Sequence, residues 1–238
     1  MYILSLDSTA TTASVALCDD ERLLACTTIH NGNTHSQTLL PLLEDTLRQF
    51  GLHTGDIGLF ACSAGPGSFT GVRIGVSTVK GLAFGTDTPC IGVSTLEALA
   101  YNLIGTNGLI CPVMNARRNQ VYNALFECSS GQLTRLCEDR AIALDELDRE
   151  LSECGTRPVY AVGDGYDLFH KQLTISTEYL CETPHLLRLQ NAYSVAQIAL
   201  QSLRTGNIGT ADSLSPIYLR PCQAERERLE RLSGQVNN

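Results

Sequence analysis

The chain has 238 residues, a formal net charge of −8 and a hydrophobic fraction of 43%, as in soluble globular proteins built as one large domain or two modest lobes. The negative charge argues against binding of a nucleic-acid backbone by this chain alone, because such binding requires a basic surface. No apolar run reaches the roughly 18 to 20 residues of a membrane helix, and the first residues lack the basic region of a signal peptide. We therefore expect a cytoplasmic protein without membrane association.

The ten cysteines include no Cys-x-x-Cys pair. Four of them lie in apolar stretches, where a thiol behaves as a small hydrophobe: Cys18, Cys62, Cys90 and Cys111. We expect reduced, structural cysteines. The closest histidines, His30 and His35, flank a glycine loop and lack the i, i+4 spacing of a helical metal pair. The sequence therefore predicts no metal site and no cofactor.

The first half of the chain alternates strand and helix patterns. Apolar and β-branched runs predict strands at 2–7, 13–18, 22–29, 57–62 and 89–93. Leucines at helical spacing predict a helix over 35–50, which Gly51 closes. A second helix is expected at about 70–84, and the capping box from Ser94 to Glu97 begins a third that runs to about 104.

The second half repeats this series. It predicts strands at 109–115, 120–127, 132–138, 158–162 and 178–181, and helices at 144–154, after Gly165, and at 191–203. The order β-β-β-α-β-α-β-α thus occurs twice, with glycines after each fourth strand. Such a duplication describes the actin-like fold of sugar kinases and heat-shock chaperones, an α/β fold of two lobes with a mixed sheet each. We expect lobes at 1–105 and 106–220, with the last helix free to pack on the first lobe, and a charged tail at 221–238.

The sequence is organised around one glycine-rich segment, Ser63-Ala-Gly-Pro-Gly-Ser-Phe-Thr-Gly-Val-Arg-Ile-Gly75. Gly65, Pro66 and Gly67 end the preceding strand, because glycine opens unusual backbone angles and proline removes a donor. Ser68 is the expected N-cap of the next helix. A strand, a glycine loop and a helix N-terminus can hold a phosphate or a nucleotide, and the candidate contacts are Asp7, Thr9, Gly65 and Gly67. The alternative is a tight turn without a ligand.

Gly67, Gly71 and Gly75 recur every four residues and therefore line one side of the loop and helix. Each interior glycine costs about 1 kcal/mol of helix stability relative to alanine. Close approach of another backbone would offset this cost. That backbone belongs either to the chain's own sheet or to a second subunit.

Few residues are placed for catalysis. Asp7 ends the first strand, where a kinase of this fold keeps an acid, but an aspartate there also caps a turn. The second-lobe turn, 116–119, lacks the glycine and hydroxyl residues of a phosphate turn, and Ser68 is outside any Gly-x-Ser-x-Gly motif. Arginines at three positions are candidates for a phosphate, for a partner carboxylate or for surface ion pairs: Arg73, Arg117 and Arg118.

The segment GPGSFTGVRIG, together with Ile91-Gly-Val-Ser-Thr-Leu96, resembles the TsaB (YeaZ) family. The resemblance extends to four further segments: Leu6–Thr9, His35–Gln37, Ala116–Arg118 with Val121 and Tyr122, and Pro216–Arg220. It is weak from about 129 to 191. The chain also has Asn115 where the family commonly has aspartate, which makes catalytic use of the second lobe less plausible.

The resemblance implies a subunit with no reaction of its own. Such a subunit pairs with the catalytic subunit TsaD, and the pair recruits the ATPase TsaE and reaches tRNA only as a complex. The complex transfers threonylcarbamoyl to the adenosine beside the anticodon of ANN-decoding tRNAs. The expected surface for TsaD and for a homodimer is the glycine helix: Ser68, Phe69, Gly71, Val72, Gly75 and Val79. Two alternatives remain, a small-molecule kinase or ATPase using Asp7 and the glycine loop, and a glycoprotease-like peptidase.

Overall fold

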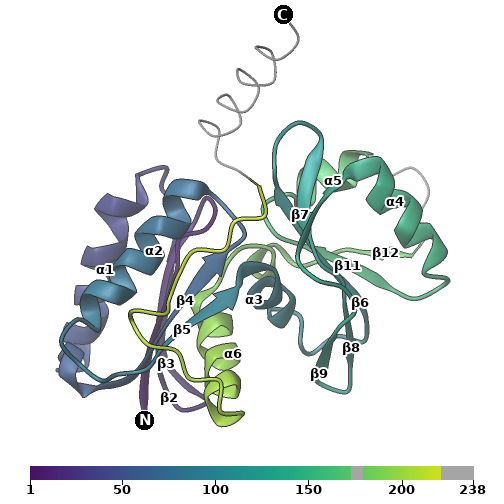
Figure 1. Ribbon diagram of the computed structural model, residues 1–238. Coiled ribbons are helices and arrows are strands. Elements are labelled where there is room, and N and C mark those ends of the chain that lie inside the picture. Colours follow the sequence, from purple (N-terminus) through teal and green to yellow (C-terminus); the bar gives the residue numbers. More distant parts are fainter. Residues whose placement is uncertain (173–178, 221–238) are drawn as a thin grey trace, which may run out of the picture.

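The computed structural model describes residues 1–172 and 179–220, which form two α/β lobes (Figure 1). The charged tail expected at 221–238 lies outside the described residues. No helix in the described part of the chain is both long and apolar enough to cross a membrane. Every cysteine that the structure describes is a free thiol, and Cys18, Cys62, Cys90 and Cys111 are buried as predicted.

The N-terminal lobe has one five-stranded mixed sheet in the order β3-β2-β1-β4-β5. β1, β2 and β3 are antiparallel, whereas β4 and β5 run parallel to β1. The strands are β1 (Tyr2–Asp7), β2 (Ala13–Asp19), β3 (Arg22–Ile29), β4 (Ile57–Gly65) and β5 (Cys90–Ser94). The helices are α1 (His35–Gln49), η1 (Thr54–Asp56), α2 (Phe69–Leu82) and α3 (Thr95–Tyr101).

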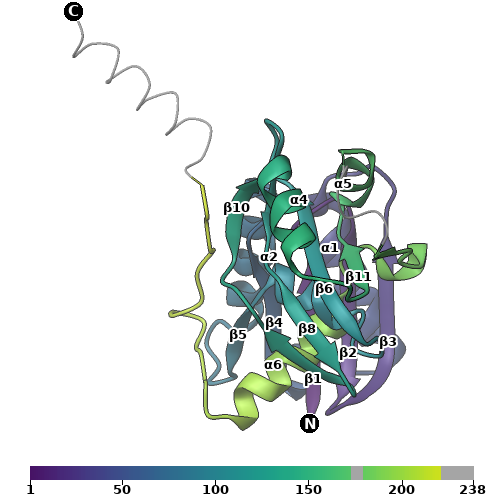
Figure 2. The same ribbon diagram turned by 90° about the vertical axis from the view of Figure 1, so that its right-hand side faces the viewer.

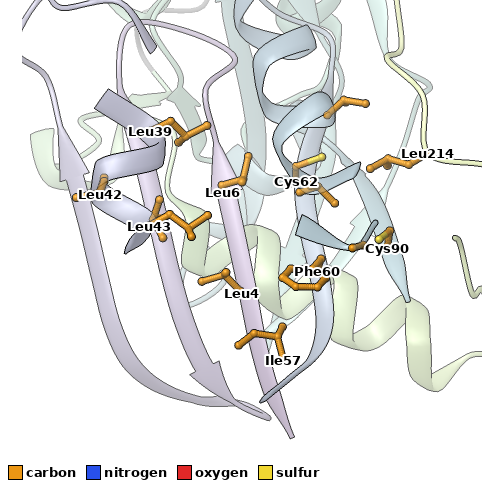
Figure 3. Packing of buried hydrophobic residues seen from close by; sticks show 14 of the residues in the cluster. Leu4, Leu6, Leu39, Leu42, Leu43, Ile57, Phe60, Cys62, Cys90 and Leu214 are labelled. Atoms are coloured by element: carbon orange, nitrogen blue, oxygen red, sulfur yellow. The ribbon is translucent and has the colours of Figure 1, made fainter. Parts of the chain in front are cut away.

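Both faces of this sheet are covered, because side chains alternate along each strand. Leu4 and Leu6 of β1 pack with leucines of α1 such as Leu43, as Figure 3 shows. Ile3 points to the other face, where it packs with Val195 of α6 (Ala192–Arg204). The last helix therefore belongs to the N-terminal sheet in space, although it follows the second lobe in sequence.

The C-terminal lobe has a seven-stranded sheet in the order β10-β7-β6-β11-β12, with β8 paired to β6 and β9 to β8. Its strands are β6 (Gly108–Asn115), β7 (Gln120–Asn123), β8 (Phe126–Ser129), β9 (Gln132–Arg135), β10 (Arg140–Ala143), β11 (Val159–Val162) and β12 (Leu180–Cys181). Its helices are α4 (Leu144–Glu153), α5 (Tyr166–Gln172) and η2 (His185–Leu187).

The predicted strand 120–127 is wrong as a single element. It breaks at Ala124 and Leu125, so that β7 pairs with the end of β6 and β8 with its beginning. The Asn123 side chain lies at the break and donates to the Pro112 and Ala124 carbonyls. The strand expected at 132–138 forms a hairpin with β8. The unpredicted strand β10, antiparallel to β7, takes the place that β3 has in the first lobe.

The lobes share a buried contact around α3. Leu96 and Leu99 of this helix pack with Ile110, Met114 and Phe126 of the second sheet. The residues from 207 to 220, which we call the strap, run along the N-terminal lobe and end near the space between the two lobes in Figure 1, and Figure 2 shows them on the same side of the molecule as β5 and β10. Leu214 of the strap packs into the first core, and the Ile217 amide donates to the Ala64 carbonyl. The range 106–220 is therefore not one spatial lobe, because α6 and the strap lie on the first.

Candidate functional site between the lobes

The first hairpin turn of each lobe has the same side-chain cap. In the first lobe, the Thr9 amide donates to Oδ1 of Asp7 at 2.8 Å. In the second, the Arg117 amide donates to Oδ1 of Asn115, also at 2.8 Å. Both are Asx turns, in which the side-chain oxygen of one residue accepts a hydrogen bond from the amide two residues later and takes the place of a backbone carbonyl. Arg117, Arg118 and Asn119 continue the second turn with positive φ angles of 62°, 54° and 60°.

Asp7 is fully buried, and both of its oxygens are used by its own chain. Oδ1 accepts from the amide and hydroxyl of Thr9, and Oδ2 accepts from the Ser63 hydroxyl. Burial raises the pKa of the Asp7 carboxyl, and these hydrogen bonds oppose that shift. The carboxylate holds β1, β4 and the first turn together. Asp7 is not among the residues that line the space between the lobes, and a phosphate or nucleotide contact through Asp7 stays a prediction.

The glycine loop is a tight connection from β4 to α2. Gly65 has a φ of 122°, the Gly65–Pro66 peptide is cis, and a side chain at Gly65 would meet the Ile217 carbonyl at 2.3 Å. Gly65 is therefore buried under the strap, and its phosphate contact stays a prediction. Ser68 caps α2 as predicted, because its hydroxyl accepts from the Gly71 amide. Gly67 and Thr9 do line the space between the lobes.

The glycine side of α2 faces the chain's own first turn. A side chain at Gly71 would meet the Ser8 carbonyl at 2.0 Å, and one at Gly75 would meet the Ser8 hydroxyl at 2.9 Å. Val72 and Val79 are buried in the N-terminal core. The glycine repeat is therefore explained by contact with the chain's own fold, and the contact of Gly71, Gly75 and these two valines with a second subunit stays a prediction. Two predicted interface residues remain accessible, Ser68 and, in part, Phe69.

A cavity of about 530 Å³ lies between the lobes, within the usual size range of small-molecule sites. The first turn, the glycine loop, the second turn, the residue after Gly163 and the strap all line it. Its polar side chains include Thr9, Thr11, Ser68, Thr70, Asn115, Arg117, Asp164 and Arg220. The two lobes and the strap therefore converge on one polar space.

Asp164 is a cavity residue that the sequence analysis did not single out. Its neighbours Gly163 and Gly165 pack on the end of β6, where a side chain would meet the Val113 carbonyl at 2.2 and 2.9 Å. Oδ1 of Asp164 is buried and has no hydrogen-bond partner among the described residues. Burial raises the pKa of the Asp164 carboxyl to about 6; hydrogen bonds from the Asn115 and Asp164 backbone oppose this shift, and the negative charge of Asp7 adds to it. The glycine pair after the fourth strand was the only signal of this residue in the sequence.

Four arginines belong to the second turn, to the strap or to α2 beside the strap, and they differ in their contacts. Arg73 stacks over the Phe69 ring at 3.8 Å and donates to the Tyr218 hydroxyl, so it fastens the strap. Arg220 donates to the Ala116 carbonyl at 2.8 Å and links the strap to the second turn. Arg117 and Arg118 are exposed and make no ion pair with the described part of the chain. Of these two, only Arg117 lines the cavity.

The histidine pair does not meet. His35 Nε2 donates to the Ala10 carbonyl at 2.7 Å and so fastens the start of α1 to the first turn. Within residues 1–172 and 179–220, no group of three His, Cys, Asp or Glu side chains is arranged to hold a metal ion.

Comparisons with known proteins agree with this architecture. Residues 29–153 match the family model of TsaD, tRNA N6-adenosine threonylcarbamoyltransferase. The chain is 32% identical over 231 residues to the tRNA threonylcarbamoyladenosine biosynthesis protein TsaB of Bacillus subtilis, covering 97% of this chain and 99% of that one. It is 31% identical to TsaB of Escherichia coli, covering 92% and 95%. The solved structure of YeaZ from Pseudomonas aeruginosa superposes with a TM-score of 0.75 at 25% identity, covering 92% and 99%.

Proposed function

The chain belongs to the TsaB family of tRNA threonylcarbamoyladenosine biosynthesis proteins, and from this premise we propose that it is the non-catalytic subunit of the transferase complex. In that role it binds TsaD, helps to recruit TsaE, and reaches tRNA only through the complex. Its net charge of −8 fits a chain that leaves tRNA binding to its partners.

The proposal that the chain is non-catalytic rests on Asp7, because both oxygens of its carboxylate accept hydrogen bonds from the chain itself. A catalytic carboxylate that binds a metal ion or activates an attacking water must have an oxygen free to contact that ion or water. Asp7 instead gives both oxygens to Thr9 and Ser63. Its counterpart Asn115 is an amide and uses Oδ1 to cap its own turn. The two positions from which a kinase of this fold would act are thus occupied by turn caps.

The outward side of α2 is the surface that we assign to TsaD and to a second copy of the chain. It bears three exposed residues at helical spacing, Arg73, Ser77 and Gly81, and the exposed Phe84 follows in the turn after the helix. Phe84 has 88% of its surface exposed, and a side chain at Gly81 would meet nothing within 4 Å. A helix stripe that is small at its centre and aromatic at its end lets another helix approach closely. We propose this stripe for the subunit contact, whereas the contact through the buried glycines stays a prediction.

Substitution on this stripe tests the subunit contact. We expect Ser77→Arg to weaken binding to TsaD by at least roughly tenfold, because a long charged side chain prevents close helix packing. Ser152→Arg is the matched control, since Ser152 is also an exposed helix serine but lies on α4 of the other lobe. Light scattering and titration calorimetry would measure association. Unchanged TsaD binding by Ser77→Arg, at an unchanged melting temperature, would overturn this assignment.

A further inference from the structure

We infer that a network of ion pairs and hydrogen bonds at the start of α3 clamps the two lobes in one relative orientation, so that they move as a single rigid body. The clamp joins Ser94 and Glu97 of the first lobe to Arg135 and Asp139 of the second. Motion between the lobes is a property of the isolated chain, so the clamp does not depend on the proposed function.

Arg135 is the centre of the clamp, because its two terminal nitrogens bind carboxylates from different lobes. Nη2 donates to Glu97 of α3 at 3.0 Å, and Nη1 donates to Asp139 in its own lobe at 2.6 Å. The guanidinium also lies over the ring of Phe126, with Cζ 4.6 Å from the ring centre. Because the Arg135 side chain is only 26% exposed, solvent screens these ion pairs less than it screens pairs between fully exposed side chains.

The Ser94 hydroxyl provides a second bond across the same boundary. As the N-cap of α3 it accepts from the Glu97 amide at 3.2 Å, and it donates to Oδ2 of Asp139 at 2.5 Å. Rotation of the second lobe away from α3 would break both of the bonds that cross the boundary. It would also leave Arg135 with one of its two carboxylates, which is costly for a partly buried charge.

The clamp lies above the apolar contact between the lobes. Helix α3 is placed between the two sheets (Figure 1), with Ala98 packed on the first and Leu96 and Leu99 on the second. Phe126, the ring beneath the guanidinium, belongs to the second of these clusters and is 1% exposed. Polar bonds at the rim and apolar packing beneath them therefore hold the same side of α3.

The other end of α3 is fastened as well. Nδ2 of Asn102, the residue after the helix, donates to the Leu187 and Leu189 carbonyls at 3.0 and 2.9 Å. The segment that contains these carbonyls is tied to the second lobe, because the Gly163 amide after β11 donates to the Arg188 carbonyl. Attachment at both ends of α3 opposes rotation of one lobe against the other about this helix.

Hydrogen exchange of the α3 amides in the full chain tests the clamp. The helix has seven residues, too few to be stable without packing, so separation of the lobes would appear as faster exchange in α3. We expect wild-type α3 to exchange as slowly as β1, and Glu97→Ala and Arg135→Lys to accelerate exchange in α3 roughly tenfold. The lysine keeps the charge but lacks the planar fork that spans both carboxylates.

The ion pair between Arg140 and Glu150 provides the matched controls, because it has similar exposure but lies entirely within the second lobe. Glu150→Ala and Arg140→Lys should leave the exchange of α3 unchanged. Fast exchange of α3 in the wild type would overturn the inference, as would equal exchange in the clamp and control variants. Equal acceleration of α3 and β1 in the clamp variants would show a general loss of stability and would also contradict it. Thermal melts of each variant would establish that the fold is retained.

Discussion

At the scale of single residues, Asp7 and Asp164 show how similar carboxyls acquire different roles. Burial raises the pKa of both. Asp7 is surrounded by donors from Thr9 and Ser63, whereas Oδ1 of Asp164 is buried without a hydrogen-bond partner among the described residues. We therefore assign Asp7 to the stability of the fold, whereas Asp164 weakens the fold when it is ionised.

Removal of the Asp7 carboxyl should be strongly destabilising. Asp7→Ala leaves the Thr9 amide and the Thr9 and Ser63 hydroxyls buried without their acceptor, at a cost of about 2–4 kcal/mol in the free energy of unfolding. Ser63→Ala removes only one of these donors and should cost about 1 kcal/mol. Urea unfolding of both variants would measure the difference. An Asp7→Ala protein as stable as Ser63→Ala would contradict the role of Asp7 as a turn cap.

Asp164 should make the protein less stable as the pH rises. Its pKa is about 6 in the folded state, against an ordinary value of 3.8, so protonation favours the fold. This contribution is fully present below the ordinary value and is lost as the pH rises through about 6. We expect Asp164→Asn to melt a few degrees higher than the wild type at neutral pH, with the gap closing toward pH 4. Comparison with the wild type cancels the effect of Asp7. A gap that is independent of pH would contradict the shifted pKa.

At the scale of elements, the glycines of α2 fall into two kinds: those on the side that packs against the first turn and one on the side that faces outward. Gly71 and Gly75 lie against Ser8, whereas Gly81 has open space around its Cα. We expect Gly71→Ala to destabilise the fold by about 2–4 kcal/mol through overpacking. Gly81→Ala should stabilise it by up to about 1 kcal/mol, because alanine is the better helix former. Thermal unfolding would test this pair, and equal stability of the two variants would refute the packing of α2 on the first turn.

The same elements show what the sequence could predict. The glycine loop, the Ser68 cap and the α1 helix were found because glycine, proline and leucine spacing act locally. The break between β7 and β8 was missed because Ala124 and Leu125 are apolar and carry no turn signal. Strand β10 was missed because its four residues become a strand only through pairing with β7. Periodicity identified the glycine face of α2 without its neighbour, and the expectation that Gly71 contacts a second subunit came from the family resemblance alone.

At the scale of the whole molecule, the duplicated series predicted the two lobes, but the chain does not divide between them at one point. Helix α6 and the strap return to the first lobe, and the strap closes one side of the cavity through Tyr218 and Arg220. The cavity could not be predicted from the sequence, because its walls come from five separate segments. Asp164 illustrates this point, since its role depends on how the second lobe meets the first.

Under the proposed function, the protein is required for threonylcarbamoyl transfer and does not perform it. The direct measurement is transfer to unmodified tRNA from threonylcarbamoyl adenylate, with TsaD and TsaE, in the presence and absence of this protein. We predict transfer only when all partners are present, and the same rate for Asp7→Asn once its folding is verified. Equal transfer without the protein would contradict the claim, and so would transfer by this protein in the absence of TsaD.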